Sequence, residues 1–188
     1  MSSQIPFIGR EDEIERIQLQ LQSKASNLIY IIGDGGVGKT RLAQEVKSRL
    51  ENQSGYFAMQ IFDFDNHSLT VFENFELRLA EDLIHNGFNL TAYSNALRDL
   101  RKMESANVSP DGLAYQREQA QNVLINVFNE EISVHKRIVF FVDTVEKSDA
   151  EYFWLDFANF LSKVKNYTCI LTGRKHVTFD LEKLLEGS

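Results

Sequence analysis

The strongest constraint on this chain is a glycine-rich segment at residues 33–40, which reads GDGGVGKT. It matches the pattern G-x-x-x-x-G-K-[ST], and it lies between an apolar run at residues 28–32 and a helical pattern of apolar residues. A continuous apolar run is typical of a strand covered on both faces in a parallel sheet. The segment is therefore predicted to join a buried strand to an amphipathic helix, which favours an α/β fold.

The residue types of this segment fit a loop that holds phosphate groups. The backbone can take positive φ and approach a ligand closely at four glycines, Gly33, Gly35, Gly36 and Gly38. Successive N–H groups and the start of the following helix then point toward one anion. Lys39 is predicted to contact the β and γ phosphates of ATP, and the Thr40 hydroxyl to bind Mg²⁺. Val37 and Arg41 belong to the same predicted nucleotide-binding segment, although a charge on the helix surface also explains Arg41.

Short apolar runs alternate with helical patterns along the rest of the chain. Residues 138–142 and 168–172 are predicted to be two further central strands, and residues 56–64 have a looser pattern that suits an edge strand. Between the strands, apolar residues recur at helical spacing. The alternation predicts a three-layer αβα sandwich with a mostly parallel sheet and right-handed crossovers. The 188 residues are expected to form one domain, with a helical segment at about 69–134.

An acidic residue ends the predicted strand 138–142. Asp143 stands where a carboxylate holds Mg²⁺, usually through water, opposite the Thr40 hydroxyl. Hydrolysis also needs a group that orients or deprotonates the attacking water, and the next residue is Thr144. Glu146 is the nearest acid beyond Asp143 and is the predicted catalytic group, with a solvated loop charge as the alternative.

The strand predicted at residues 168–172 leads into Arg174. In open α/β sheets, ligands bind at the carboxyl ends of the strands, where Thr172 and Arg174 are expected. An arginine can bind phosphate oxygens through two parallel hydrogen bonds. Arg174 is therefore predicted to sense the γ-phosphate, and a surface charge at a strand end is the alternative.

Composition argues against several other classes of function. A net charge of −7 disfavours non-specific binding to nucleic acid or anionic membranes, and the cluster of Arg98, Arg101 and Lys102 has acidic neighbours typical of a solvated helix face. No apolar run approaches the length of a membrane span, and no leader pattern opens the chain. With Cys169 as the one cysteine, a cytoplasmic protein without disulfides is expected. Four scattered histidines predict no zinc site.

Four blocks together resemble the STAND class of signal-transducing P-loop ATPases, of the AP-ATPase or NACHT type. They are residues 6–13 (PFIGREDE), 33–40, 143–146 (DTVE) and 171–174 (LTGR). The resemblance implies a P-loop NTPase core of the ASCE type that binds ATP or ADP with Mg²⁺. It also implies that Phe7 and Ile8 pack near the adenine and that Arg10 lies close to the nucleotide.

Two departures from the family pattern affect these expectations. The family usually carries a second acid directly after the first, and Thr144 at that place predicts slow hydrolysis. The family core also continues into a further strand, a helical lid and a winged-helix domain, so the chain is expected to be truncated before them. The strand before the phosphate loop would then have an unpaired edge. Other protein domains or further copies of the chain are the expected partners.

Three functions are consistent with the sequence. The preferred one is the nucleotide-binding switch of a signal-transduction ATPase, with slow hydrolysis of ATP to ADP and phosphate. The second is an AAA or origin-recognition-like ATPase that acts on nucleic acid. The third is an interaction module that binds ATP and never hydrolyses it.

Overall fold

The computed structural model describes residues 9–106, 108–148, 151–174, 181 and 185 of the chain. Helices and strands alternate within these residues as the sequence predicts. Their order and bounds are α1 (Glu11–Leu21), β1 (Asn27–Ile32), α2 (Lys39–Glu51), β2 (Tyr56–Asp63), η1 (His67–Thr70), α3 (Phe72–His85), α4 (Thr91–Ser105), α5 (Pro110–Asn126), η2 (Val127–Ile132), β3 (Arg137–Asp143), η3 (Val145–Lys147), α6 (Glu151–Lys163) and β4 (Tyr167–Gly173).

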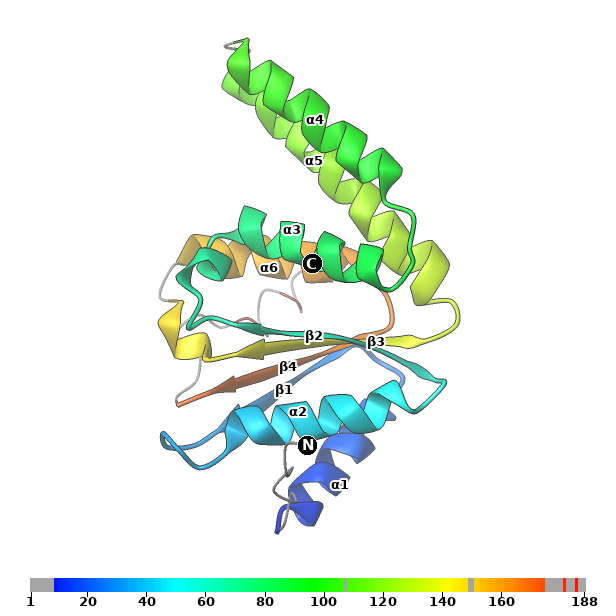
Figure 1. The fold of residues 1–188 in the computed structure, drawn as a ribbon, viewed down its shortest axis with the longest axis vertical. Coiled ribbons are helices and arrows are strands. Elements are labelled where there is room, and N and C mark those ends of the chain that lie inside the picture. Colours follow the sequence, from blue (N-terminus) through cyan, green and yellow to red (C-terminus); the bar gives the residue numbers. More distant parts are fainter. Residues whose placement is uncertain (1–8, 107, 149–150, 175–180, 182–184, 186–188) are drawn as a thin grey trace, which may run out of the picture.

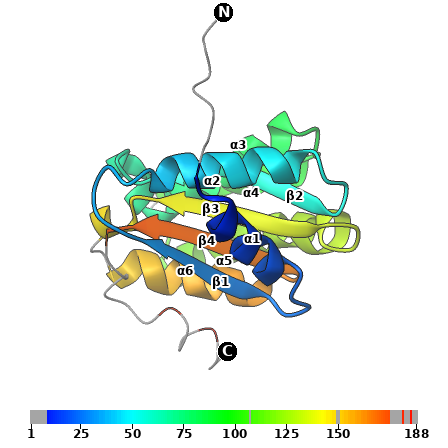
Figure 2. The same ribbon diagram turned by 90° about the horizontal axis from the view of Figure 1, so that it is seen from below.

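The four strands form one parallel sheet in the order β1-β4-β3-β2. Helices α1 and α2 cover one face of the sheet, and α3 and α6 cover the other (Figures 1 and 2). The structure is thus the predicted three-layer αβα sandwich, and β2 lies at the predicted edge. β4 is inserted between β1 and β3, which is the strand order of the ASCE type.

β1 forms the other edge of the sheet among the described residues, as the expected unpaired edge implies. Both of its faces are covered as predicted: Leu28 and Tyr30 pack against the core on the side of α3 and α6, and Ile29 and Ile31 belong to the core on the side of α1 and α2. The free edge still leaves part of the strand to solvent, and Ile32 at its carboxyl end is 41% exposed. β3 and β4, which are paired on both sides, are buried throughout.

The predicted helical segment at 69–134 consists of α3, α4 and α5 with the short helices η1 and η2. Helices α4 and α5 pack against each other as a hairpin, which projects beyond α3 away from the sheet (Figure 1). The hairpin is therefore the part of the described chain that extends farthest from the sheet.

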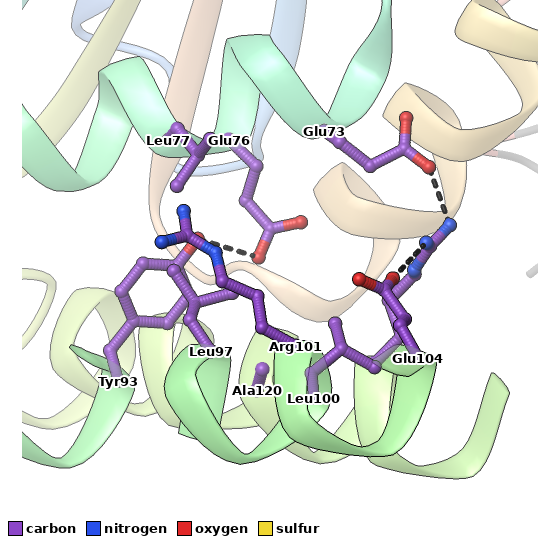
Figure 3. A pocket seen from close by; sticks show the side chains of 10 residues that line it. Glu73, Glu76, Leu77, Tyr93, Leu97, Leu100, Arg101, Glu104 and Ala120 are labelled. Atoms are coloured by element: carbon purple, nitrogen blue, oxygen red, sulfur yellow. Dashed lines mark hydrogen bonds and ion pairs between the residues drawn. The ribbon is translucent and has the colours of Figure 1, made fainter. Parts of the chain in front are cut away.

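A small cleft lies where the hairpin meets α3 (Figure 3). Glu76 of α3 lines this cleft and is 7% exposed, and Tyr93 Oη donates a hydrogen bond to Glu76 Oε1 at 3.3 Å. Arg117 at the rim forms ion pairs with Glu73 at 2.6 Å and with Glu104 at 3.5 Å. Burial removes the Glu76 carboxylate from water and raises its pKa to about 7, although the bond from Tyr93 opposes the shift.

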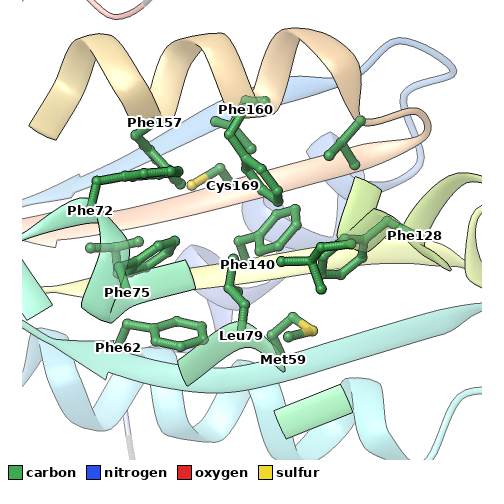
Figure 4. Close-up of a cluster of buried hydrophobic side chains, with 14 of the residues drawn as sticks. Met59, Phe62, Phe72, Phe75, Leu79, Phe128, Phe140, Phe157, Phe160 and Cys169 are labelled. Atoms are coloured by element: carbon green, nitrogen blue, oxygen red, sulfur yellow. The ribbon is translucent and has the colours of Figure 1, made fainter. Parts of the chain in front are cut away.

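The larger core cluster fills the space between the sheet and helices α3 and α6 and is rich in phenylalanine (Figure 4). Phe140 of β3 packs against Phe128 with ring centroids 5.5 Å apart and against Phe160 at 6.1 Å. Its neighbours in the strand, Val139 and Phe141, belong to the smaller cluster under α1 and α2. Because side chains alternate along a strand, β3 contributes to both cores and fixes the order of the layers.

A buried arginine joins three segments at the amino end of the sheet. Arg137 is 7% exposed, and its Nε donates a hydrogen bond to Thr168 Oγ1 at 2.7 Å. Nη1 donates to the Ser23 carbonyl at 2.6 Å and Nη2 to the Tyr167 carbonyl at 2.9 Å. The sequence analysis assigned no role to Arg137, because Ser23 lies 114 positions earlier in the chain.

Replacement of Glu76 by glutamine is expected to flatten the pH dependence of stability. The pKa of Glu76 is about 7 in the folded chain and near its ordinary value of 4.5 when unfolded. Folding therefore takes up a proton at pH values between these two. The stability that Glu76 gains from this proton is fully present below pH 4.5 and is lost as the pH rises through 7. Between pH 5 and 8 the parent should lose about 2 to 3 kcal/mol of unfolding free energy relative to Glu76→Gln.

Urea unfolding at a series of pH values measures this difference. Glu15→Gln, on the exposed face of α1, is the matched control and should keep the slope of the parent. An equal slope in Glu76→Gln and the parent would contradict the burial of an ionisable carboxyl group at this position.

Candidate functional site

The glycine-rich segment 33–40 connects β1 to α2 at the carboxyl end of the sheet, the end to which the arrows of β3 and β4 point (Figure 1). Gly33 N donates a hydrogen bond to the Gly173 carbonyl of β4 at 3.2 Å, which ties the start of the loop to the neighbouring strand. Gly36 and Gly38 have φ values of 81° and 88°, in the left-handed region that favours glycine. The predicted strand–loop–helix arrangement is therefore present.

Lys39 lies inside the curve of this loop. Its Nζ donates hydrogen bonds to the carbonyl oxygens of Gly33 and Asp34, at 2.8 and 2.9 Å. Thr40 follows in the first turn of α2 and is exposed, so that its hydroxyl is accessible to a metal ion. The first N–H groups of a helix have no partner within it, and the helix dipole adds partial positive charge there. An ammonium group, a hydroxyl and these N–H groups can together hold phosphate and Mg²⁺.

Three polar side chains form a row on the sheet face that α2 covers. Asp63 of β2 is in register with Asp143 of β3, and the pairing of β3 with β4 puts Thr172 beside Asp143. Side chains alternate between the two faces of a strand, so Asp63, Asp143 and Thr172 each lie on the same face as the residue two positions before. The earlier residues pack in the core cluster that contains α2: Ile61, Phe141 and Ile170.

The carboxylate of Asp143 is buried at the centre of this row. The residue is 2% exposed, and its Oδ1 accepts hydrogen bonds from Thr144 N, at 2.8 Å, and from Thr172 Oγ1. Its Oδ2 is buried and has no hydrogen-bond partner among the described residues. Buried polar atoms almost always have a partner, so an anionic oxygen left unpaired beside the phosphate loop fits an additional ligand. A water molecule bound to Mg²⁺ has the right chemistry to donate to it.

Thr144 connects the carboxylates of two strands. Its backbone is left-handed, with φ 60° and ψ 40°, which costs a non-glycine residue about 1 to 2 kcal/mol. In this conformation its N–H bonds to Asp143 and its Oγ1 donates to Asp63 Oδ1 at 2.9 Å. The two bonds offset the backbone strain and hold Asp63 in place.

Arg174 and Glu146 contact each other beside the glycine-rich loop. Glu146 Oε2 accepts a hydrogen bond from Arg174 N at 3.0 Å, and Glu146 Oε1 lies 3.4 Å from Arg174 Nε. The Arg174 guanidinium lies so close to Gly35 that a Cβ on that glycine would be 3.2 Å from Nη2. The predicted sensor arginine is thus in contact with the loop, while Glu146 uses both of its oxygens to hold it.

The remaining predicted residues are placed as follows. Arg10 precedes α1, and its Nη2 donates a hydrogen bond to the carbonyl oxygen of Val37 in the loop. Arg41 is exposed in the first turn of α2. Phe7 and Ile8 lie outside the described residues.

The described part of the chain contains no group of three or more histidine, cysteine, aspartate or glutamate side chains placed to hold a metal ion. None of its helices combines the length and the apolar character that crossing a membrane requires.

Residues 6–170 match the model of a protein family described as AAA ATPase domain. Over 47 residues the chain is 43% identical to chaperone protein ClpB 1 of Nostoc sp. and 45% identical to chaperone protein ClpB of Pseudomonas putida. These matches cover 25% of this chain but only 5% and 6% of the two chaperones. They therefore compare one short segment of much longer proteins.

Two solved structures resemble the whole of this chain. One is the Aeropyrum pernix ORC1 protein in complex with DNA, with a TM-score of 0.56 and 14% sequence identity. The other is the Aeropyrum pernix ORC2 protein in ADPNP-ADP complexes, with a TM-score of 0.53 and 12% sequence identity. The likeness covers 100% of this chain and 45% and 46% of those proteins. At this level of identity it shows a shared fold, and the chain spans less than half the length of either neighbour.

Substitution of Gly38 tests the conformation of the loop. A Cβ at this position would meet nothing within 4 Å, so Gly38→Ala is expected to cost about 1 to 2 kcal/mol through its positive φ alone. Gly55→Ala is the control, because that site is equally open and has no positive φ. Its cost should stay within about 0.5 kcal/mol in urea unfolding. Equal stabilities of the two variants would contradict a left-handed backbone at residue 38.

Proposed function

We propose a function for this chain from one premise, which is that it belongs to the AAA ATPase domain family. The chain binds ATP with Mg²⁺ and acts as the nucleotide-binding switch domain of a signal-transduction ATPase. It hydrolyses ATP slowly to ADP and phosphate. The proposal extends to a cytoplasmic location and to partners that are other protein domains or further copies of the chain.

The observation that supports Mg²⁺ most directly is the unpaired Oδ2 of Asp143, buried at the same end of the sheet as the phosphate loop. The metal itself supplies charge neutralisation between the phosphates. Thr40 would bind it directly through the hydroxyl, and Asp143 would accept from one of its waters. Thr172 keeps the Asp143 carboxylate oriented through its bond to Oδ1.

The phosphates would replace contacts that the protein now makes with itself. Lys39 donates to two loop carbonyls, and Arg174 is paired with Glu146, so both cations are already at the loop. A γ-phosphate offers stronger charge-assisted bonds to both. Bound ATP would therefore change the contacts of Arg174, whereas ADP lacks the γ-phosphate that would reach this side chain. In this proposal the adenine packs against Phe7 and Ile8, with Arg10 nearby.

Hydrolysis needs a carboxylate that can act on water. Two acids flank Asp143 at this end of the sheet, Glu146 on the side of Arg174 and Asp63 on β2. Thr144 stands directly after Asp143, and a hydroxyl is a poor base at neutral pH. This arrangement supports slow turnover.

A role on nucleic acid is the second candidate, because one structural neighbour is an ORC1 protein in complex with DNA. The surface of this chain disfavours it. Lys102 pairs with Asp99 at 2.9 Å, and Arg98 donates to the side chain of Asn95 on the same helix. The chain has a net charge of −7, and the basic residues of the hairpin are matched by acidic ones, so the hairpin lacks the excess positive charge that a phosphate backbone needs.

Titration of a fluorescent ATP analogue with and without Mg²⁺ tests the proposed site. Lys39→Ala should lower the affinity at least about tenfold, because it removes a cation from the phosphates, and Asp143→Asn should weaken the dependence on Mg²⁺. Lys47→Ala is the matched control on the same helix, since its ammonium group pairs with Glu51. It should bind as the parent does.

Equal affinities of Lys39→Ala and Lys47→Ala would contradict the proposed site. Phosphate release, measured on the same samples, separates the enzyme from the binding module. Tight binding of Mg-ATP with no phosphate release in the parent would favour the module that never hydrolyses ATP.

A further inference from the structure

We infer that Asp63 is the carboxylate that orients and deprotonates the attacking water, and that Thr144 positions it. This inference rests on the proposed ATP site and adds a catalytic residue to it. The sequence analysis assigned no role to Asp63, which lies 81 positions before Thr144.

Asp63 stands in the same row as the proposed metal-side aspartate. It is the Cα partner of Asp143 in the neighbouring parallel strand, and both lie on the face that α2 covers. Neighbouring strands are about 4.8 Å apart, so the two carboxylates are adjacent at the carboxyl end of the sheet. A water molecule in reach of Asp63 is therefore also beside the proposed Mg²⁺ site.

The two oxygens of Asp63 have different surroundings. Oδ1 accepts hydrogen bonds from Thr144 Oγ1 at 2.9 Å and from Asp65 N at 3.0 Å. No hydrogen bond to Oδ2 is found among the described residues. Asp63 is half-buried on the edge strand β2, so solvent reaches part of the residue. One oxygen is thus held in place and the other remains for a water molecule.

Glu146 is less suited to the same task. Both of its oxygens contact Arg174, and its side chain is 15% exposed. To act as a base it would have to give up the arginine that it places against Gly35. We therefore assign Glu146 to positioning Arg174.

The strained backbone of Thr144 fits this division of roles. A non-glycine residue with φ 60° places its N–H on Asp143 and its hydroxyl on Asp63, so one residue sets the spacing between the two carboxylates. An acidic residue at this position would supply a base itself. Here the base stands on the adjacent strand, and the residue after Asp143 holds it.

The reaction balances without a further reactant. Asp63 takes a proton from water as the water oxygen bonds to the γ-phosphorus. The bond from that phosphorus to the bridging oxygen of ADP breaks, and its electron pair stays with ADP. The proton then passes from Asp63 to solvent or to the released phosphate.

Single-turnover phosphate release and Mg-ATP binding, measured together on the parent and three variants, test the inference. Asp63→Asn should slow release at least about 100-fold, because it removes the base, with binding within about threefold of the parent. Glu146→Gln should slow release by about tenfold or less, because it removes the ion pair that holds Arg174 while a glutamine oxygen can still accept from Arg174 N. Asp65→Asn is the matched control, since Asp65 is an exposed acid two residues away and should behave as the parent.

A split between binding and turnover distinguishes positioning from simple structural support. Thr144→Val should slow single-turnover release at least about tenfold while Mg-ATP binding stays within about threefold of the parent, because loss of the hydroxyl bond leaves Asp63 unoriented and removes no group from the phosphates. Thr144→Ser keeps the hydroxyl and should restore release.

Each other outcome overturns the inference. Normal release in Asp63→Asn with loss of release in Glu146→Gln would assign the base to Glu146. Binding of Mg-ATP without any release in the parent would remove the reaction and leave the binding site intact. Absence of Mg-ATP binding in the parent would defeat the proposed function itself, together with this inference.

Discussion

The hydrogen bond from Thr172 to Asp143 links the two halves of the proposed site. It exists because β4 lies between β1 and β3, with Gly173 bonded to the first residue of the phosphate loop and Thr172 bonded to the strand end that carries Asp143. Burial on both faces holds β4 rigidly, so the loop and the aspartate are fixed relative to each other. A site built on strand ends in this way keeps its geometry better than one built on loops alone.

The cationic side chains of the site are bonded to other groups of the protein. Lys39 bonds to carbonyl oxygens of its own loop, and Arg174 bonds to Glu146 while its guanidinium lies against Gly35. Neither cation has to be brought in from a distant position when phosphate binds. In the proposed function, the exchange of one partner for another would turn a binding event into a conformational signal, because Arg174 directly follows β4. A ligand shifts a protein only through contacts that differ between its states.

Local patterns in the sequence predicted much of the fold and the placement of part of the proposed site. Residues 33–40 and Asp143 could be placed at strand ends because they directly follow apolar runs, and residues 138–142 and 168–172 could be assigned to strands because buried strands are continuously apolar. The contacts of Arg137 and Asp63 could not be predicted, since their partners come from distant parts of the chain that only the strand order brings together. The unpaired edge of β1 was expected from the family resemblance alone, because the sequence of a strand does not state how many neighbours it has.

The claim on which the account depends is that Thr40 and Asp143 share one metal ion across the phosphate loop. A crystal structure of the chain with Mn²⁺ and a non-hydrolysable ATP analogue, with anomalous scattering to locate the metal, tests it most directly. The account predicts one metal peak about 2 Å from Thr40 Oγ1, with a bound water between the metal and Asp143 Oδ2. A metal peak away from these two residues, or an analogue bound at another end of the sheet, would contradict it.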